Sequence, residues 1–439
     1  MQLTAGQAAR LAAEQRHILD SLGAELGYWR SVSRSGCPLE KHRSQVDAVA
    51  TLLSPGLEDA ELRLADGRGD QVPGQVLDLF HIWDFFRGRF VLRQVRDHRR
   101  WLDAADELAW ECYRPVMAAA GGPPREPVLV GLGRDASPRA HRRGSVYREL
   151  LPRGGVHTRQ GRAAAQRLPF PVVDVPWYCV GHLPAVLTVA HEVAHHIEDD
   201  FALTGELRSR TACAGLPSDR AAVWIRWASE VFADTCAAVL CGPAFTAVLA
   251  DTLAALPADA AQAPDGPHPP PDTRVSLSAA AAELAGHPAV DGPPGVALAD
   301  ATGREAAAVA EALLRPGWPQ LGGLSLLALL APERPVELPA AAQRLLRGFP
   351  SRCTTAAGVL SAAAWAFQLD PDGYDRRGVG AAAVAEVLRL RPPGSRAGRA
   401  AAETEAQARR RERDLETGRM LLAALAQTAE SPPPDPAHG

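Results

Sequence analysis

Two histidines and two carboxylic acids lie on stretches of the chain that are otherwise almost free of charge. Residues around His191 and His195 read TVAHEVAHHI, a mainly apolar run. The segment WASEVFADTCAAVLC at 227–241 carries Glu230 and Asp234 and no Lys or Arg. Carboxylates are almost never fully buried without a partner, so a fold that buries these segments must bring positive charge to both acids. This requirement restricts the possible folds more than any other sequence feature.

The motif H-E-x-x-H places His191 and His195 four residues apart. Positions four apart lie on one face of an α-helix, so both imidazoles can bind one metal ion, and this spacing is typical of zinc. Glu192 lies one residue along, beside the ion without binding it. A carboxylate there can take a proton from metal-bound water. The motif therefore predicts a zinc site with Glu192 as general base.

Glu230 and Asp234 are also four residues apart and share a face of the following helix. Because no Arg or Lys lies between Trp227 and Phe245, we expect a zinc ion and its histidines to supply the missing positive charge. Glu230 is predicted as the third zinc ligand, the alternative being a buried carboxylate paired with a distant arginine. Asp234 is expected to accept the other ring N–H of His191 and fix its tautomer.

The sequence H-E-V-A-H followed by E-V-F-A-D resembles the H-E-x-x-H … E-x-x-x-D signature of gluzincin metallopeptidases, a group that includes thermolysin-like enzymes. The metzincin pattern would need Gly at 198 and His at 201, where this chain has Glu198 and Phe201. A further segment, His268-Pro269-Pro270 followed by Arg274, resembles an H-P … R stretch found after the glutamate ligand in one gluzincin subgroup. That likeness implies catalytic roles for His268 and Arg274 near the scissile carbonyl and its oxyanion.

The resemblance implies a zinc metallopeptidase with a peptide or protein as substrate. In such an enzyme Glu192 acts as general base and then passes the proton to the leaving amine. The zinc ion and a donor such as His268 hold the oxyanion. The segment Pro171–Trp177 (PVVDVPW) has strand composition, and its prolines favour a sheet edge. As zincin edge strands do, it could pair with an extended peptide.

The expected fold is α+β and predominantly helical, with a zincin-like core in which the active-site helix lies under a small sheet and the Glu-ligand helix follows. We expect four regions: an N-terminal helical region (1–120), the metal-binding core (121–255), a C-terminal helical region (256–390), and a charged helix with a disordered tail (391–439).

Boundaries within the core follow from composition and breaker residues. A strand is expected at Val128–Leu132 and a solvated loop, alternatively an anion-binding patch, at Arg134–Arg148. The first motif helix should begin near Pro184, and the second should run unbroken from Ser218 to Cys241. A mixed-charge helix is expected at 400–428.

Composition restricts the partners, the cysteine chemistry and the cellular compartment that we expect for this protein. The chain has 47 basic and 51 acidic residues among 439, which points neither to nucleic acid nor to an acidic membrane surface. Its seven cysteines form no C-x-x-C pair, so neither a disulfide framework nor a thiolate zinc site is indicated. Without an apolar leader or a long apolar run, a cytoplasmic protein is expected, with leaderless export and the oligomeric state left open.

Two other functions fit the same residues. A zinc-stabilised binding or scaffold protein could keep the site without turnover, although such a protein would not need Glu192 and a structural site is usually closed by four protein ligands. A zinc hydrolase that acts on a bond other than a peptide is the third possibility.

Overall fold

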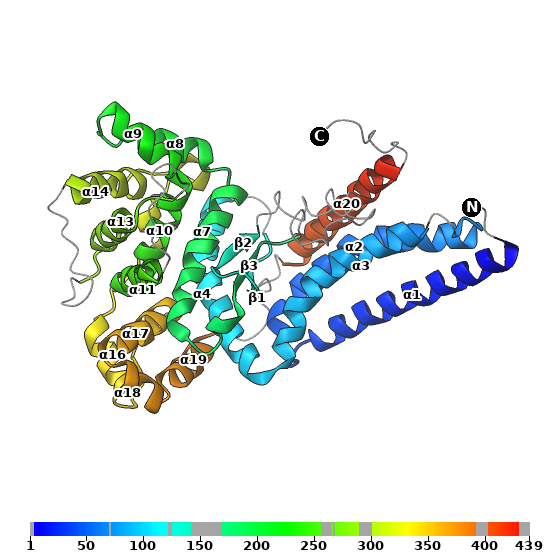
Figure 1. Cartoon of the computed structure of the whole chain (residues 1–439), viewed down its shortest axis with the longest axis horizontal. Coiled ribbons are helices and arrows are strands. Elements are labelled where there is room, and N and C mark those ends of the chain that lie inside the picture. The colour runs from blue at the N-terminus through cyan, green and yellow to red at the C-terminus, as the bar shows by residue number, and fades with distance from the viewer. Residues whose placement is uncertain are drawn as a thin grey trace.

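The computed structural model describes residues 4–69, 72–121, 125–141, 169–255, 266, 268–288, 301–391 and 403–429. The protein is mostly helical and contains a three-stranded mixed sheet, which confirms the predominantly helical expectation. Figure 1 shows the elements along the chain. The α-helices are α1 (Ala5–Val32), α2 (Arg43–Ala65), α3 (Val72–Val91), α4 (Arg96–Ala120), α7 (Thr188–Asp200), α8 (Thr204–Ala212), α9 (Ser218–Arg226), α10 (Ala228–Cys241), α11 (Pro243–Ala254), α13 (Pro271–Leu284), α14 (Ala301–Leu314), α15 (Leu326–Leu330), α16 (Leu338–Leu346), α17 (Ala356–Leu369), α18 (Pro371–Arg376), α19 (Val379–Leu390) and α20 (Glu403–Ala429). The strands are β1 (Leu129–Gly133), β2 (Arg139–His141) and β3 (Val172–Pro176).

The sheet has the order β1-β3-β2, with β1 parallel and β2 antiparallel to the central strand. The expectation that the proline-flanked strand lies at a sheet edge is therefore wrong. Pro171 precedes β3 and Pro176 is its last residue, so the prolines flank the strand interior instead of interrupting it. The residues between them keep their amides for both neighbouring strands, and Val173 faces Val130 on one side and Ala140 on the other.

Alternation along the strands sends side chains to two different cores. Val130 and Val173 belong to the large core built with α4, α7 and α10, whereas Leu129 and Val172 pack into the core formed with α1, α2 and α3. This is the period of two that a strand buried on both faces shows. The sheet is thus covered by the N-terminal helices on one face and by α4 and α7 on the other (Figure 1).

The helix that carries H-E-x-x-H lies near the middle of the large core. It packs against α4 on one side and α10 on another, and it also touches β2 and β3. His196 secures it to the sheet, because its Nε2 lies 3.0 Å from the carbonyl oxygen of Val172. Helix α13 packs against α10, so residues that follow the second motif helix return to the same place.

Three local boundaries differ from expectation. A 3₁₀ turn, Leu183–Leu187, precedes α7, which begins at Thr188 rather than near Pro184. The helix expected from Ser218 to Cys241 is broken into α9 and α10. Within the stretch expected as a loop, Arg139–His141 form β2, and the remainder from 142 to 148 lies outside the described residues.

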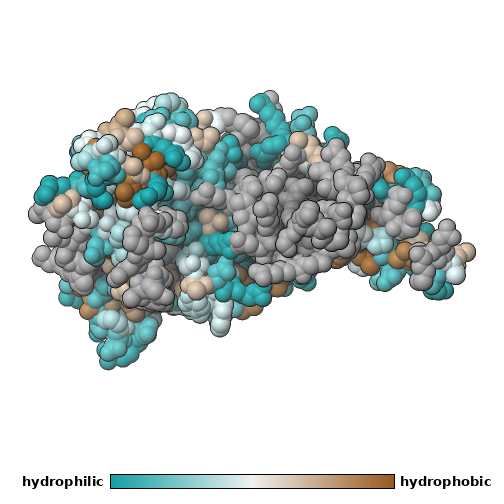
Figure 2. Space-filling view, turned by 45° about the horizontal axis from the view of Figure 1, so that its top comes forward, coloured by the Kyte–Doolittle hydropathy of each residue, from teal (hydrophilic) through white to brown (hydrophobic). Residues whose placement is uncertain are grey.

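The cysteines are free thiols, as the spacing indicated. Among the helices that the structure describes, none combines the length and apolar character that a membrane crossing requires. On the face shown in Figure 2, hydrophobic residues occur in small groups among hydrophilic ones. The C-terminal helix α20 matches the expected charged helix, while the tail expected to be disordered lies outside the described residues.

Candidate metal centre

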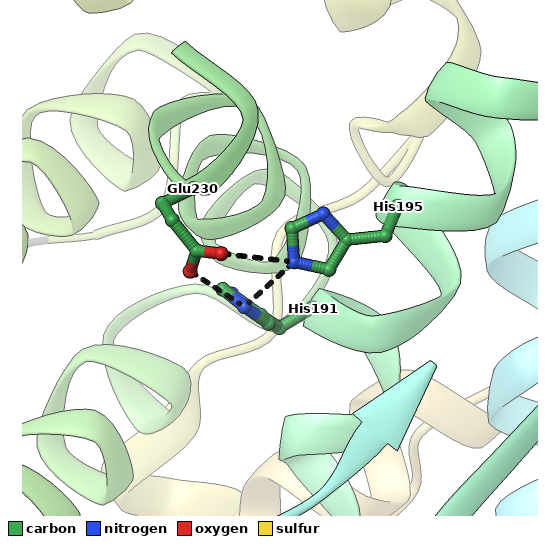
Figure 3. A group of neighbouring side chains, drawn as sticks. All are labelled: His191, His195 and Glu230. Carbon is green, nitrogen blue, oxygen red and sulfur yellow. Dashed lines mark hydrogen bonds and ion pairs between the residues drawn. The ribbon is translucent and has the colours of Figure 1, made fainter. Parts of the chain in front are cut away.

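His191 and His195 on α7 and Glu230 on α10 point toward a common position (Figure 3). The two Nε2 atoms are 3.3 Å apart. Oε2 of Glu230 lies 3.4 Å from Nε2 of His191, and Oε1 lies 3.5 Å from Nε2 of His195. Both histidines are buried, so this group of three side chains could hold a metal ion.

These separations can be compared with the geometry of zinc. Zinc binds nitrogen and oxygen at about 2.0–2.1 Å in tetrahedral sites, and the ligands of such a tetrahedron are then about 3.3–3.4 Å apart. The separation of the two Nε2 atoms, 3.3 Å, agrees with that spacing, and each Nε2 lies 3.4–3.5 Å from a different oxygen of Glu230. The donor set of two imidazoles and one carboxylate is one that suits a divalent metal such as zinc, which His191, His195 and Glu230 would hold.

The break between α9 and α10 determines where Glu230 lies on its helix. Trp227 ends α9 and caps α10 with φ −90° and ψ 1°, so Glu230 falls in the first turn of α10. A carboxylate is stabilised there by the positive end of the helix dipole. In one continuous helix the same residue would lie in the interior and lose that contribution.

Asp234, one turn further along α10, is fully buried and orients His191. Its Oδ1 lies 2.9 Å from Nδ1 of His191, as expected from the spacing. Arg274 on α13 donates to both oxygens of Asp234, at 2.7 and 2.8 Å. A distant arginine therefore supplies part of the positive charge expected from zinc and the histidines, and it pairs with Asp234.

Ionisation in this cluster is strongly coupled. Burial alone would lower the pKa of His191, but the hydrogen bonds to Asp234 and Glu230 outweigh it and raise the pKa to about 10. Burial would raise the pKa of Glu230, but His191 and the neighbouring positive groups hold it well below the usual range. Glu230 and Asp234 therefore both remain ionised, and without a metal a proton on His191 supplies positive charge beside them. A bound metal ion could supply that charge instead.

Glu192 lies beside the three converging side chains and is not one of them. Its carboxylate is buried, and burial raises its pKa against the opposing charge of His191. The backbone N–H of Ala140 on β2 donates to it. Strand β2 therefore reaches the candidate site at the residue predicted as general base.

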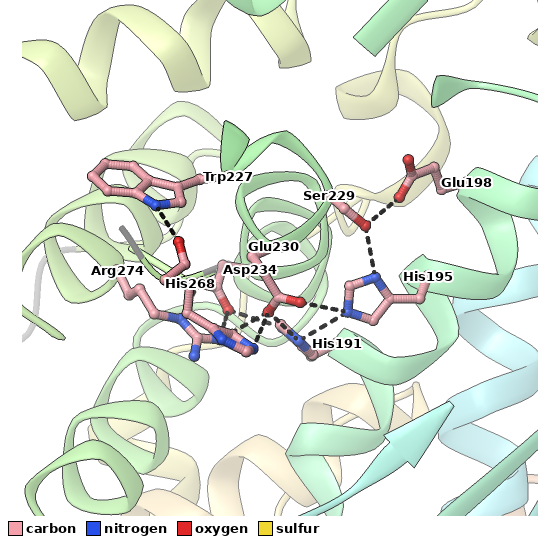
Figure 4. Close-up of polar contacts among 10 residues, drawn as sticks. His191, His195, Glu198, Trp227, Ser229, Glu230, Asp234, His268 and Arg274 are labelled. Carbon is pink, nitrogen blue, oxygen red and sulfur yellow. Dashed lines mark hydrogen bonds and ion pairs between the residues drawn. The ribbon is translucent and has the colours of Figure 1, made fainter. Parts of the chain in front are cut away.

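A second contact network, which the motifs do not predict, lies behind His195 (Figure 4). Nδ1 of His195 lies 3.2 Å from Oγ of Ser229, and that hydroxyl donates to Oε2 of Glu198 at 2.5 Å. Glu198 is only 2% exposed although it lies on α7 three residues after His195. In the sequence, only the acid Glu198 on the motif helix could have suggested this network. The hydroxyl that connects it to His195 comes from another helix, α10.

The structure also places the two residues of the H-P … R segment near Glu230. Nε2 of His268 lies 3.5 Å from Oε2 of Glu230, with 57% of the His268 side chain exposed. Arg274 is buried, and its Nη2 lies 3.9 Å from the same oxygen. His268 thus lies on the solvent side of the site, whereas Arg274 holds Asp234. Their catalytic roles stay predictions.

His42, Asp103 and Asp106 form a second group of potential ligands, but guanidinium groups already supply its positive charge. Arg93 donates to Nε2 of His42 at 3.0 Å and to Oδ2 of Asp106 at 2.7 Å. Arg391 donates to Asp103 at 3.0 Å. A cation bound here would lie against Arg93, so this group is a buried ion-pair network.

No family model, curated protein or solved structure matches the chain.

Proposed function

We propose that this protein is a zinc-dependent hydrolase and, more specifically, a metallopeptidase of the gluzincin type. The observation that carries the proposal is the set of separations of 3.3–3.5 Å among the ligand atoms of His191, His195 and Glu230. A purely structural zinc site is usually closed by four protein ligands, and the described part of the chain supplies three to this group. A zinc ion held by these three residues would keep a position for water or substrate, next to the buried carboxylate of Glu192.

When bound, a zinc ion supplies a Lewis acid that lowers the pKa of a water ligand to about 7. Glu192 is the residue placed to accept and return a proton, because it lies next to His191 without being a ligand. Burial raises its pKa, which makes its carboxylate a stronger base than an exposed glutamate. His268 is exposed and close to Glu230, so it can donate to a substrate oxygen.

The peptide-binding element in this proposal is β2 rather than β3. Strand β2 lies at the edge of the three described strands, and its Ala140 amide reaches Glu192. An extended peptide paired along this edge would bring its backbone carbonyls close to the candidate site. Backbone pairing of this kind would favour peptides over other hydrolysable substrates.

The proposal is tested with purified protein, by metal analysis followed by digestion of a peptide library with and without a chelator. We expect about one zinc ion per chain and cleavage that the chelator abolishes. Glu192→Gln keeps the size and the Ala140 contact of Glu192 but removes its basicity. This variant should retain zinc and lose about 10²- to 10⁴-fold in cleavage rate.

Two outcomes would contradict the proposal that this protein is a zinc peptidase. Undiminished cleavage by Glu192→Gln would remove the proposed base. Stoichiometric zinc without chelator-sensitive cleavage would favour the zinc-stabilised binding or scaffold protein instead.

A further inference from the structure

His191 and His195 are held by different kinds of partner. His191 contacts a carboxylate directly, through Asp234 at 2.9 Å. Nδ1 of His195 instead contacts the hydroxyl of Ser229, which lies between it and the carboxylate of Glu198. The three helices α7, α8 and α10 meet at this second chain of contacts, since Thr204 at the start of α8 donates to the other oxygen of Glu198 at 2.9 Å.

The chemistry of the groups fixes the direction of these hydrogen bonds. A carboxylate only accepts, so the single proton of the Ser229 hydroxyl goes to Glu198. The hydroxyl oxygen can then accept from His195, which requires the proton of that ring to be on Nδ1. In the neutral ring, the form that binds a metal, Nε2 of His195 then directs its lone pair at the position that it shares with His191 and Glu230.

We infer that Ser229 and Glu198 are positioning residues that fix the tautomer and ring orientation of His195 for metal binding. The inference rests on the proposed zinc site but not on peptidase activity. Partners behind metal-binding histidines commonly contribute 10- to 100-fold in metal affinity. Neither residue belongs to the H-E-x-x-H or E-x-x-x-D patterns by which the site is recognised in the sequence.

The two hydrogen bonds that the buried carboxylate of Glu198 accepts have different functions in this inference. Glu198 is 2% exposed, and its two oxygens are divided between Thr204 and Ser229. The Thr204 contact ties α8 to α7, whereas the Ser229 contact leads to the metal position. The two hydrogen bonds of one carboxylate can therefore be removed separately, and only one of them should affect metal binding.

The test compares zinc affinity, measured by competition with a fluorescent chelator, in the wild type and three variants. Ser229→Ala removes the hydroxyl and should weaken zinc binding by about 10- to 100-fold. Ser229→Thr restores a hydroxyl at the same position and should recover most of the affinity. Thr204→Val removes the other hydrogen bond of Glu198 and should leave the affinity close to that of the wild type. Thermal melting of each metal-free variant verifies folding.

Cobalt supplies a readout independent of turnover. The visible absorption of Co²⁺ bound to the wild type and to Ser229→Thr should match, whereas Ser229→Ala should show an altered spectrum because His195 is free to rotate. Equal zinc affinity in Ser229→Ala and the wild type would overturn the inference, as would an equal loss in Thr204→Val. A wild type that binds no zinc would overturn the metal site itself, while zinc binding without cleavage would overturn only the peptidase.

Discussion

Asp234 contacts both a cation and a candidate metal ligand. Arg274 forms a bidentate pair with it, and His191 shares one of the same oxygens. Because Asp234 is fully buried, either partner alone would leave it poorly compensated. With Arg274 balancing Asp234, Glu230 remains as the negative ligand that opposes the charge of a bound metal.

The first prediction concerns the pH dependence of the metal-free protein. The pKa of His191 is raised to about 10 in the fold, against about 6.5 when unfolded. Its contribution to stability is therefore fully present below about pH 6.5 and lost as the pH rises toward about 10. In the presence of a chelator, the free energy of unfolding should fall across this range by a few kcal/mol.

His191→Gln is the matched control, because it should lack this slope while keeping the rest of the site. Chemical denaturation at successive pH values measures both curves. Parallel curves for the two proteins would show that His191 holds no additional proton in the folded state.

At the scale of elements, the break at Trp227 decides how the site is assembled. The sequence favoured one helix because no Gly or Pro lies between Ser218 and Cys241. Tertiary contacts decided otherwise: Arg220 and Trp224 both bind Glu305 on α14. Helix α9 is thus held against α8 and α14, while α10 turns to pack along α7.

A buried ion pair ties the sheet to the N-terminal helices. Asp174 on β3 accepts from Nε of Arg89 on α3 at 3.0 Å and lies 2.8 Å from Nε2 of His141 on β2. Gly131 on β1 faces Asp174, and a Cβ there would come within 2.4 Å of the carboxylate. One acid thereby connects a helix and all three strands, including the strand whose Ala140 amide reaches Glu192.

The second prediction is that Asp174→Asn destabilises the protein by about 3–5 kcal/mol, since it leaves Arg89 buried without its partner. Burial would raise the pKa of Asp174, but Arg89 and His141 lower it to about 2. Its contribution is present above the usual pKa of 3.8 and is lost as the pH falls toward about 2.

Urea denaturation between pH 2 and 5 measures this contribution, and acidification should destabilise the wild type more than the variant. An Arg89→Met/Asp174→Asn double variant should be less destabilised than Asp174→Asn alone, because no unpaired charge remains. A double variant at least as unstable as Asp174→Asn alone would refute the pairing argument.

At the scale of the whole molecule, the C-terminal helix α20 packs against the N-terminal helix α2. One apolar core extends from Trp101 on α4 to Val387 on α19, and another lies among α1, α2 and α3. Helix α20 returns to pack along α2 (Figure 1). Gly418 permits the close approach, because a Cβ there would lie 2.5 Å from the carbonyl oxygen of Leu52 and 3.0 Å from Pro55.

The third prediction is that Gly418→Ala loosens α20 from α2. In an exposed helix, alanine should stabilise by up to about 1 kcal/mol relative to glycine. A loss of protection from hydrogen exchange in this variant would therefore come from the steric conflict of the added methyl group with α2. Hydrogen–deuterium exchange should become faster in α20 and in α2 around Leu52, with zinc affinity unchanged. Glu416→Ala, at an exposed position two residues away, is the control and should leave exchange in α2 unaltered.

The sequence by itself determined the features that depend on helical periodicity. Residues four apart must share a helix face, so the pairs His191 with His195 and Glu230 with Asp234 could be assigned without coordinates. The contact between Asp234 and His191 followed from the same spacing. The helical character of most of the chain could likewise be predicted, because apolar periodicity is local.

Only the tertiary structure decided which distant residues complete the site. Arg274 on Asp234, Ser229 and Glu198 behind His195, and the central position of β3 all depend on contacts between separate elements. Prolines at the two ends of a strand are compatible with either an edge or a central position in the sheet. Likewise, the sequence around a serine does not show whether a carboxylate lies behind it in the fold. Such contacts are set by the packing of whole helices and strands, which no short stretch of sequence records.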